Sequence, residues 1–460
     1  MTFAPSRREL LRSAGAGMGL LGLSGLLESS TVANAQAARG PHFVPRAKRV
    51  ISLFMGGGPS QVDTFDPKPK LAEHSGDLPE DIAESFRAER LVAQGGLMPS
   101  PFKFRQYGES GIPVSELLPR TAAFVDDMAV VRSLHTDFPN HAPALCMMNL
   151  GVLTPTRPSL GSWTTYGLGT ENENLPGFVV LCPGKPVLGP KLWSNAFLPG
   201  RFQGTHLNHS KPQPEQLIPH LKNAALDRNA MSEQLDLIRQ LNARHRDQRT
   251  DADDLDTRIR SMELAFRMQS DALDAFDISR EPESVQTEYG SSRFSRACLM
   301  ARRLSERGVR FVQLYYGSGQ PWDTHGENDK RHRQLCGDMD RPVAALLGDL
   351  KRRGLLEETL VTWGGEFGRT PTTQGKNGRD HNQFGFSWWL AGGGIRGGTV
   401  YGATDEFGFR AIRDKVHVHD LHATILHLLG IDHERLVYRY SGRDFRLTDV
   451  RGRVINEIVA

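Results

Sequence analysis

Short apolar runs recur along the chain, and each of them ends in glycine or polar residues. Residues 49–55 (RVISLFM) lead into Gly56-Gly57-Gly58-Pro59, and residues 128–134 (MAVVRSL) repeat the pattern. Short β-branched and apolar runs with such ends are typical of buried strands that run into a loop. The pattern therefore predicts a strand at both places, each positioning the loop that follows it.

The second half of the chain alternates helical and strand patterns. Predicted helices cover 297–307, closed by Gly308, and about 330–353, closed by Gly354. Parallel strands need a crossover connection, so this alternation is typical of parallel strands with helices on both faces. We predict an α/β fold with a mostly parallel sheet sandwiched by helices. The accompanying strands are 309–316, 359–363 and 387–390.

A helical insertion is predicted at about 214–277, between the two halves of the sheet. Its apolar residues recur at helical spacing with charged residues between them, which indicates amphipathic helices. Two interpretations remain: a supporting helical layer, or a cap or partner-binding arm over the site. The apolar positions are Leu235, Ile238, Leu241, Leu255, Ile259, Met262 and Phe266.

The N-terminus resembles a twin-arginine signal peptide. Arg7 and Arg8 stand in SRRELL, a glycine-broken apolar run follows at 14–27, and small residues (ANA) occupy 33–35. The apolar run falls short of the roughly 20 residues of a spanning helix. We predict a signal peptide over 1–35 and a mature domain over 36–460. The expected partner is the twin-arginine translocase, the expected location is periplasmic or extracellular, and no stable membrane span is expected after cleavage.

Composition places few further limits on function. The chain has 460 residues and a formal charge of +3, so nothing in it calls for nucleic acid as a partner. Its four cysteines are scattered, without a CxxC pair, in mostly apolar surroundings. That setting is typical of buried thiols, and their spacing leaves the question of a disulfide open.

Most of the candidate chemistry lies in loops that follow predicted strands. Carboxylates and imidazoles from several strand ends can approach one cation from separate directions, so their convergence predicts a divalent metal site. Each residue alone also has a plainer interpretation, such as a turn cap, a surface histidine or a pair between Glu366 and Arg369. The groups are Asp63 and Asp66 in GGPSQVDTFDPKP, Thr136 to His141 in HTDFPNHA, Asp323 and His325 in WDTH, Glu366 in GGEFGRTP, and Asp380 and His381 in GRDHNQ.

The order of these pieces resembles the alkaline phosphatase superfamily. Over nearly all of the mature chain it is similar to the sulfatase-like family called domain of unknown function 1501, and GGPSQVDTFDPKP, WDTHGEN, GEFGRTP and GRDHNQ carry the match. The segment at 419–431 is similar to the helix after the last core strand of sulfatases. The resemblance implies that Asp63, Asp323, His325 and His381 take the places of metal ligands.

Three departures from the resemblance bear on activity. Glu366 followed by Phe367 replaces an adjacent Asp-His pair, which implies that one of two metal sites is weakened or lost. The FPNH tetrapeptide is similar to the nucleophile region of nucleotide pyrophosphatases, but Asp137 holds the place of the attacking threonine and Thr136 comes one residue earlier. No Cys-x-Pro-x-Arg segment is present, which excludes a formylglycine mechanism.

Two functional hypotheses follow. The first is a metal-dependent hydrolase of phosphate or sulfate esters, acting on a small-molecule or glycan anionic ester. Its cation could be zinc, manganese, magnesium or calcium. The alternative is a non-catalytic binding or scaffold protein of the cell envelope that keeps the fold. The predicted metal ligands are Asp63, Asp323, His325, Glu366, Asp380 and His381, and the predicted catalytic residues are Thr136, Asp137, Asn140, His141 and Arg369.

Overall fold

The structure is a computed structural model that describes residues 40–89, 92–211, 213–217 and 271–460, with a few positions between 229 and 263. The predicted signal peptide lies outside the described residues, as does most of the predicted insertion at 214–277. At the two ends of that insertion the structure describes α7 (Pro214–Leu217) and α10 (Asp271–Phe276).

A nine-stranded sheet forms the centre of the molecule, in the order β12-β4-β11-β8-β1-β7-β5-β6, with β15 paired to β4. The central strands β1, β7 and β8 run parallel, and β5 and β6 continue the parallel part. The prediction of a mostly parallel sheet is therefore confirmed. The bounds are β1 (Arg49–Phe54), β4 (Met128–His135), β5 (Phe178–Leu181), β6 (Thr205–Leu207), β7 (Phe311–Tyr315), β8 (Thr359–Gly364), β11 (Phe386–Ala391), β12 (Thr399–Tyr401) and β15 (Val416–His417).

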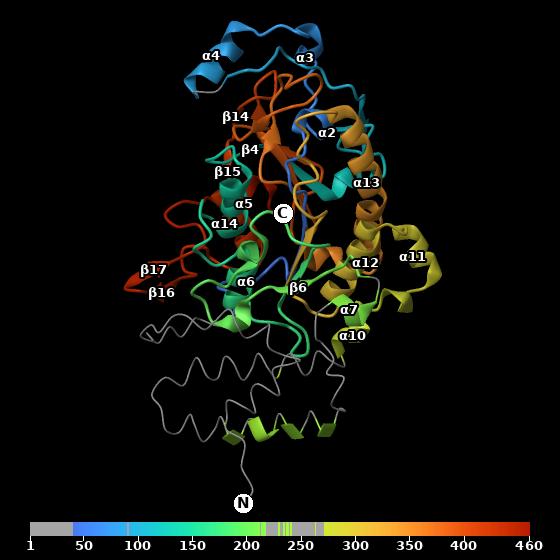
Figure 1. Cartoon of the computed structure of the whole chain (residues 1–460), viewed down its shortest axis with the longest axis vertical. Coiled ribbons are helices and arrows are strands. Elements are labelled where there is room, and N and C mark those ends of the chain that lie inside the picture. The colour runs from blue at the N-terminus through green and yellow to red at the C-terminus, as the bar shows by residue number, and fades with distance from the viewer. Residues whose placement is uncertain are drawn as a thin grey trace, which may run out of the picture.

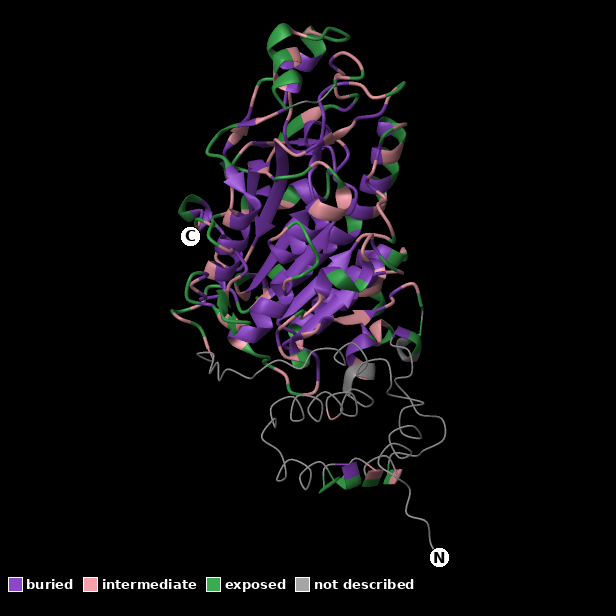
Figure 2. Cartoon of the chain, turned by 60° about the vertical axis from the view of Figure 1, so that its left-hand side comes forward, coloured by how far each residue is buried: buried purple, intermediate pink, exposed green. Residues whose placement is uncertain are grey.

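Helices cover both faces of this sheet because its strands are apolar on both sides. Along β1, Ile51 and Leu53 join one hydrophobic cluster, and Val50 and Phe54 join the other. Figure 1 shows α12 and α13 at the right of the sheet and α5, α6 and α14 at the left. Figure 2 shows the central strands of the sheet mostly in the colour of buried residues. The bounds are α5 (His141–Leu150), α6 (Leu160–Leu168), α11 (Glu283–Tyr289), α12 (Arg293–Glu306), α13 (Asn328–Arg352) and α14 (Val418–Leu428).

One strand of the sheet departs from the predicted alternation of helix and strand. β11 pairs antiparallel with both β4 and β8. Residues 365–385, all of which the structure describes, contain no helix and instead form the small hairpin of β9 (Gly368–Arg369) and β10 (His381–Asn382). Without a helical crossover the chain returns in the opposite direction. That hairpin carries part of the candidate site.

Short helices, 3₁₀ turns and two-stranded sheets complete the structure. The short helices are α2 (Gln61–Thr64), α3 (Lys70–Glu73) and α4 (Glu80–Ala88), with 3₁₀ turns at Thr121–Asp127, Gly189–Trp193, Gly200–Phe202, Ile278–Arg280, Leu356–Glu358 and Asn456–Ile458. The remaining strands are β2 (Phe104–Tyr107), β3 (Ile112–Ser115), β13 (Ala403–Thr404), β14 (Ala411–Arg413), β16 (Tyr438–Tyr440) and β17 (Arg443–Phe445).

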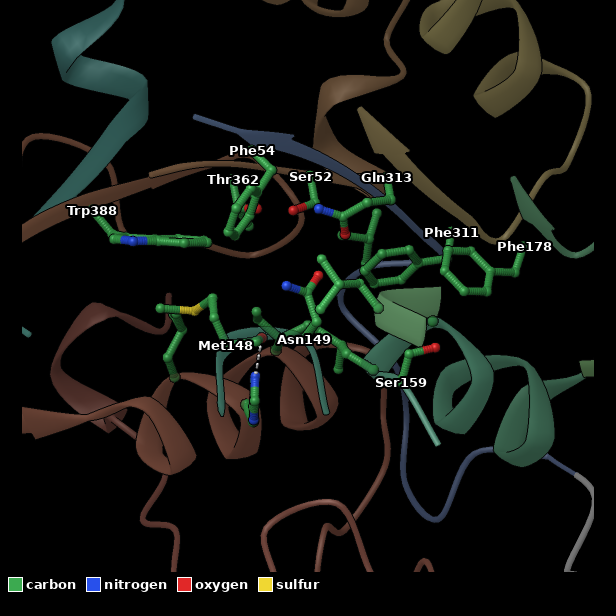
Figure 3. Close-up of a pocket in the computed structure, with 17 residues that line it drawn as sticks. Ser52, Phe54, Met148, Asn149, Ser159, Phe178, Phe311, Gln313, Thr362 and Trp388 are labelled. Atoms are coloured by element: carbon green, nitrogen blue, oxygen red, sulfur yellow. Dashed lines mark hydrogen bonds between the residues drawn. The ribbon is translucent and has the colours of Figure 1, made fainter. Parts of the chain in front are cut away.

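A row of polar side chains crosses the middle of the sheet. Ser52 pairs in register with Gln313 on one side and Thr362 on the other. The three side chains line a cavity of about 20 Å³ between the sheet and the helices α5, α6 and α14 (Figure 3). Within the described chain, Gln313 Nε2 and Thr362 Oγ1 have no hydrogen-bond partner. None of the predicted site residues lines this cavity.

All four cysteines are buried and unpaired. Among the described residues, no helix combines the length and the apolar character needed to span a bilayer.

Candidate metal centre

Four side chains from three loops converge beyond the carboxyl ends of the central strands. Asp323 and His325 lie in the loop after β7, His381 lies on β10, and His141 is the first residue of α5. Each offers one ligand atom, and these atoms all lie within 4.8 Å of one another. We call these four residues the His3Asp cluster. The group could hold a metal ion.

The Asp323 carboxylate lies at the centre of the His3Asp cluster. Its Oδ1 is 2.9 Å from His325 Nε2 and 3.2 Å from His381 Nε2, and its Oδ2 is 3.3 Å from His141 Nε2. The His325 side chain is 40% exposed, whereas those of His141 and His381 are 13% and 14% exposed. The cluster is therefore open to solvent on the side of His325.

Two imidazoles of the cluster face each other through the same ring atom. His325 Nε2 and His381 Nε2 are 3.0 Å apart. The other ring nitrogen of His325 contacts the amide oxygen of Gln374. An acceptor at that position favours a proton on Nδ1, which leaves Nε2 as a lone pair. Two nitrogens at this distance need a proton or a cation between them.

Burial and charge act in opposite directions on the cluster. Burial alone would raise the pKa of Asp323, but its close contacts with His141 and His381 and the Arg369 guanidinium hold it well below its usual value. Burial lowers the pKa of His381. Burial would also lower the pKa of His141, but the carboxylates of Asp323 and Glu366 raise it. The contact between His141 Nε2 and Asp323 Oδ2 is close, at 3.3 Å, but lacks hydrogen-bond geometry.

Arg369 borders the cluster through its contact with Asp323. The residue is fully buried, and its Nη2 is 2.7 Å from Asp323 Oδ1. The same Nη2 also donates to the carbonyls of Gly57 and Trp322, while Nε donates to the carbonyl of Gly58 and Nη1 to that of Arg379. The sequence predicted Arg369 as a catalytic residue that steadies an anionic group. The structure instead commits it to Asp323 and to the backbone of the neighbouring loops.

Asp63 departs from its predicted place as a metal ligand. It is fully buried on α2, and it accepts from Arg379 Nε at 2.8 Å, Ser60 Oγ at 2.6 Å and Asn328 Nδ2 at 2.9 Å. Burial would raise the pKa of Asp63, but the charge of Arg379 lowers it to about 2. Its carboxylate is satisfied by the chain itself, and Asp63 stands outside the His3Asp cluster.

Glu366 and Asp380, also predicted as ligands, lie just outside the cluster. Glu366 Oε1 is 2.7 Å from His141 Nδ1, and both of its oxygens accept from the Gly57 amide. Asp380 Oδ1 is 3.8 Å from His325 Nδ1, which is the ring nitrogen turned away from Asp323. Phe367 packs its ring against His141 and His381, with centroid distances of 4.9 and 4.5 Å, and so forms a wall of the site.

The HTDFPNHA segment brings only His141 into the cluster. Thr136 is 5% exposed, and its hydroxyl has no hydrogen-bond partner among the described residues. Asp137 Oδ1 lies 3.2 Å from His417 Nε2, and Asn140 is the exposed N-cap residue of α5. His141, predicted as a catalytic residue, is instead a candidate ligand. Sequence reasoning missed Gln374, which stands in none of the quoted motifs, and Arg379, which stands in GRDHNQ but was not singled out there.

The parallel sheet and the polar cluster beyond its strand ends define an α/β protein with a candidate cation site. The family described as protein of unknown function (DUF1501) matches residues 47–459. The chain belongs to that family, and the predicted recognition is confirmed. A search of curated proteins gave no match.

Solved structures that the chain is similar to include sulfatases and phosphatases. A sulfatase from Pseudoalteromonas sp. is 13% identical with a TM-score of 0.34, covering 93% of this chain and 73% of that one. The lipoteichoic acid synthase from Listeria monocytogenes is 8% identical with a TM-score of 0.35, covering 88% and 76%. The alkaline phosphatase from the Antarctic bacterium TAB5 is 10% identical with a TM-score of 0.33, covering 84% and 98%.

Proposed function

We propose that this protein is a hydrolase of phosphate or sulfate esters that uses one divalent cation held by the His3Asp cluster. The observation that carries the proposal is the 3.0 Å approach of His325 Nε2 to His381 Nε2 beside the Asp323 carboxylate. These nitrogens need a proton or a cation between them. A cation would meet that need, and it would take His141 Nε2 as a further donor.

The donor set favours zinc or another first-row transition metal over magnesium or calcium. Three imidazoles and one carboxylate suit those ions, whereas magnesium and calcium prefer sites built from oxygen. A single ion is expected, because Asp63 is already neutralised by Arg379. The Glu366 carboxylate is occupied by the Gly57 amide and His141.

In the proposed reaction, residues of the chain bind the cation, hold its ligands in place and keep water from part of the site. A divalent cation held by Asp323, His325, His381 and His141 would lower the pKa of a nearby water and would offset negative charge on the ester oxygens. Thr136 is buried and Asp137 faces His417, so we propose water as the nucleophile rather than either side chain. Arg369 holds Asp323 in place, and Phe367 shields one side of the imidazoles from water. The exposed side of His325 is where an anionic ester would enter.

Metal analysis combined with turnover tests the proposal. The purified mature protein should carry one transition-metal ion and should hydrolyse at least one member of a panel of aryl phosphates, phosphodiesters and aryl sulfates. Asp323→Asn and His325→Ala should lose both the ion and the activity. The matched controls Asp444→Asn and His74→Ala should keep both the ion and the activity. Asp444 lies on an exposed hairpin, and the His74 side chain is exposed. A protein that binds no cation and cleaves no ester would end the proposal.

A second candidate, a binding protein that keeps the cation without turnover, is favoured by one observation. Arg369, the cationic residue predicted to hold an anionic group, is fully buried and committed to Asp323. The two candidates give different results in one experiment. Zinc-dependent binding of an anionic glycan with no hydrolysis on the panel supports the binding protein, and zinc-dependent turnover supports the hydrolase.

We also propose that the chain is exported by the twin-arginine route to the periplasm or beyond. The support is the SRRELL sequence, the apolar run at 14–27 and the ANA at 33–35. Lysine substitution of Arg7 and Arg8 together should keep the full-length precursor in the cytoplasm of an expressing bacterium. Unchanged export of that variant would contradict the proposal.

A further inference from the structure

Glu366 reaches the His3Asp cluster only through His141. It follows β8 and is fully buried, and its Oε1 lies 2.7 Å from His141 Nδ1. Both carboxylate oxygens accept from the Gly57 amide, at 3.0 and 3.1 Å. A buried carboxylate without partners would be strongly unfavourable, so the hydrogen bonds with His141 and the Gly57 amide stabilise Glu366 in its buried position.

The contact with Glu366 determines which nitrogen of His141 can bind a cation. A carboxylate is an acceptor only, so the imidazole must place its proton on Nδ1 to bond with it. The neutral ring then presents a lone pair at Nε2. That atom lies 3.3 Å from Asp323 Oδ2, on the inner side of the cluster. The carboxylate thereby selects both the tautomer and the direction of the ring.

Gly57 links this carboxylate to the loop that carries Asp323. Its φ is +113°, and a Cβ there would lie 2.4 Å from the Asp323 amide nitrogen. Only glycine permits such a close approach of the two backbones. The Gly57 amide therefore fixes Glu366 at a constant distance from the loop of Asp323. The aromatic ring of Phe367 covers His141 on one side, which keeps the hydrogen bond to Glu366 away from water.

We infer that Glu366 is a positioning residue, which holds His141 in the Nδ1–H tautomer with Nε2 directed at the cation. The cation in this inference depends on the proposed function. The tautomer of His141 does not. Carboxylate–histidine–metal arrangements of this kind preorganise a ligand, and their loss typically weakens metal affinity about 10- to 100-fold. Glu366 takes this role in place of the direct coordination predicted from the sequence.

The tautomer of His141 can be measured without any metal. We expect ¹⁵N spectra of the metal-free protein, taken in alkaline buffer, to show His141 with its proton on Nδ1. The His141→Gln variant assigns the signal. In Glu366→Leu the proton should shift toward Nε2. A wild-type protein with the proton on Nε2 would overturn the inference, whatever the variants do.

Zinc affinity provides the second measurement. A competition titration should find binding about 10- to 100-fold weaker in Glu366→Leu than in the wild type. Glu366→Gln keeps one acceptor oxygen for the Nδ1–H of His141, so it should retain the tautomer. Its zinc affinity should lie between those of the wild type and Glu366→Leu. Glu358→Leu, at an exposed position before β8, is the matched control and should change neither quantity. Wild-type zinc affinity in a folded Glu366→Leu protein would contradict the inference.

The two proposals fail in different ways. If the wild type binds no zinc but His141 carries its proton on Nδ1, the hydrolase proposal fails and the tautomer assignment stands. If the wild type binds zinc and hydrolyses esters with the proton on His141 Nε2, only the role of Glu366 fails. Should Glu366→Leu not fold, the wild-type spectrum and the Glu366→Gln titration decide the question.

Discussion

Acid should destabilise the protein through a histidine far from the metal centre. His422 on α14 is 1% exposed, and its Nε2 lies 2.8 Å from the carbonyl oxygen of Met148. Its Nδ1 has no partner among the described residues. Burial, with a smaller effect of His419, lowers the pKa of His422 to about 3. The folded protein therefore keeps this ring neutral.

The size of the effect follows from the difference in proton binding. An unfolded histidine has a pKa of about 6.5, so below that pH the unfolded chain binds a proton that the folded chain refuses. The contribution to stability is fully present above about pH 6.5 and is lost as the pH falls toward the folded pKa. Between about pH 6.5 and pH 5 the loss amounts to about 2 kcal/mol for this one group. Solvent does not screen this energy appreciably, because the ring is buried.

The change in slope isolates His422 from other effects. His422→Asn should reduce the dependence of the unfolding free energy on pH by about 1.4 kcal/mol per pH unit between about pH 5 and pH 6. The variant will also be less stable overall because packing is lost, but that term does not depend on pH. Neighbouring His417, with its pKa lowered to about 4, stays in both proteins.

Urea unfolding followed by tryptophan fluorescence, in the presence of EDTA, measures the slope. His74→Asn is the control, because the His74 side chain is 40% exposed. It should leave the slope unchanged. If His422→Asn showed the same pH dependence as the wild type, the reasoning from burial would be refuted.

Two further predictions concern buried polar groups. Arg379→Met should lower the unfolding free energy by about 3 to 5 kcal/mol, because it leaves the fully buried Asp63 carboxylate without its cationic partner. In urea unfolding, the double variant Asp63→Asn, Arg379→Met should recover part of that loss. A cost below about 1 kcal/mol for the single variant would show that the pair is not buried as described. Thr362→Val removes a buried hydroxyl that has no partner in the described chain, so thermal unfolding should show unchanged or higher stability, by up to about 1 kcal/mol. A clear loss would mean that the hydroxyl is satisfied within the cavity.

The fold could be predicted from the sequence where the apolar pattern was local and strong. The predicted strand at 49–55 is β1 (Arg49–Phe54), and the predicted helix at about 330–353 is α13 (Asn328–Arg352). The direction of β11 could not be predicted, because it depends on a connection that contains a hairpin in place of a helix. The short strand β5 (FVVL) fits the same apolar pattern but was not predicted, whereas β6 (THL) lacked a distinctive local signal.

The candidate site was predictable as a region more than as a set of contacts. The sequence placed Asp323, His325 and His381 at strand ends that meet, and the structure brings them together. It could not assign a partner to Asp63, because that depends on Arg379, 316 residues further along the chain. The place of His141 depends on where α5 begins relative to the sheet, which no local pattern determines.

Arg369 acts as an internal tie between loops that are distant in sequence. Its guanidinium bonds the backbone of the loop after β1, the backbone and Asp323 of the loop after β7, and the Arg379 carbonyl. All of these bonds are made within the polypeptide. These contacts hold Asp323 in position from within the polypeptide, so an ion that enters or leaves the cluster need not disturb the loops around it.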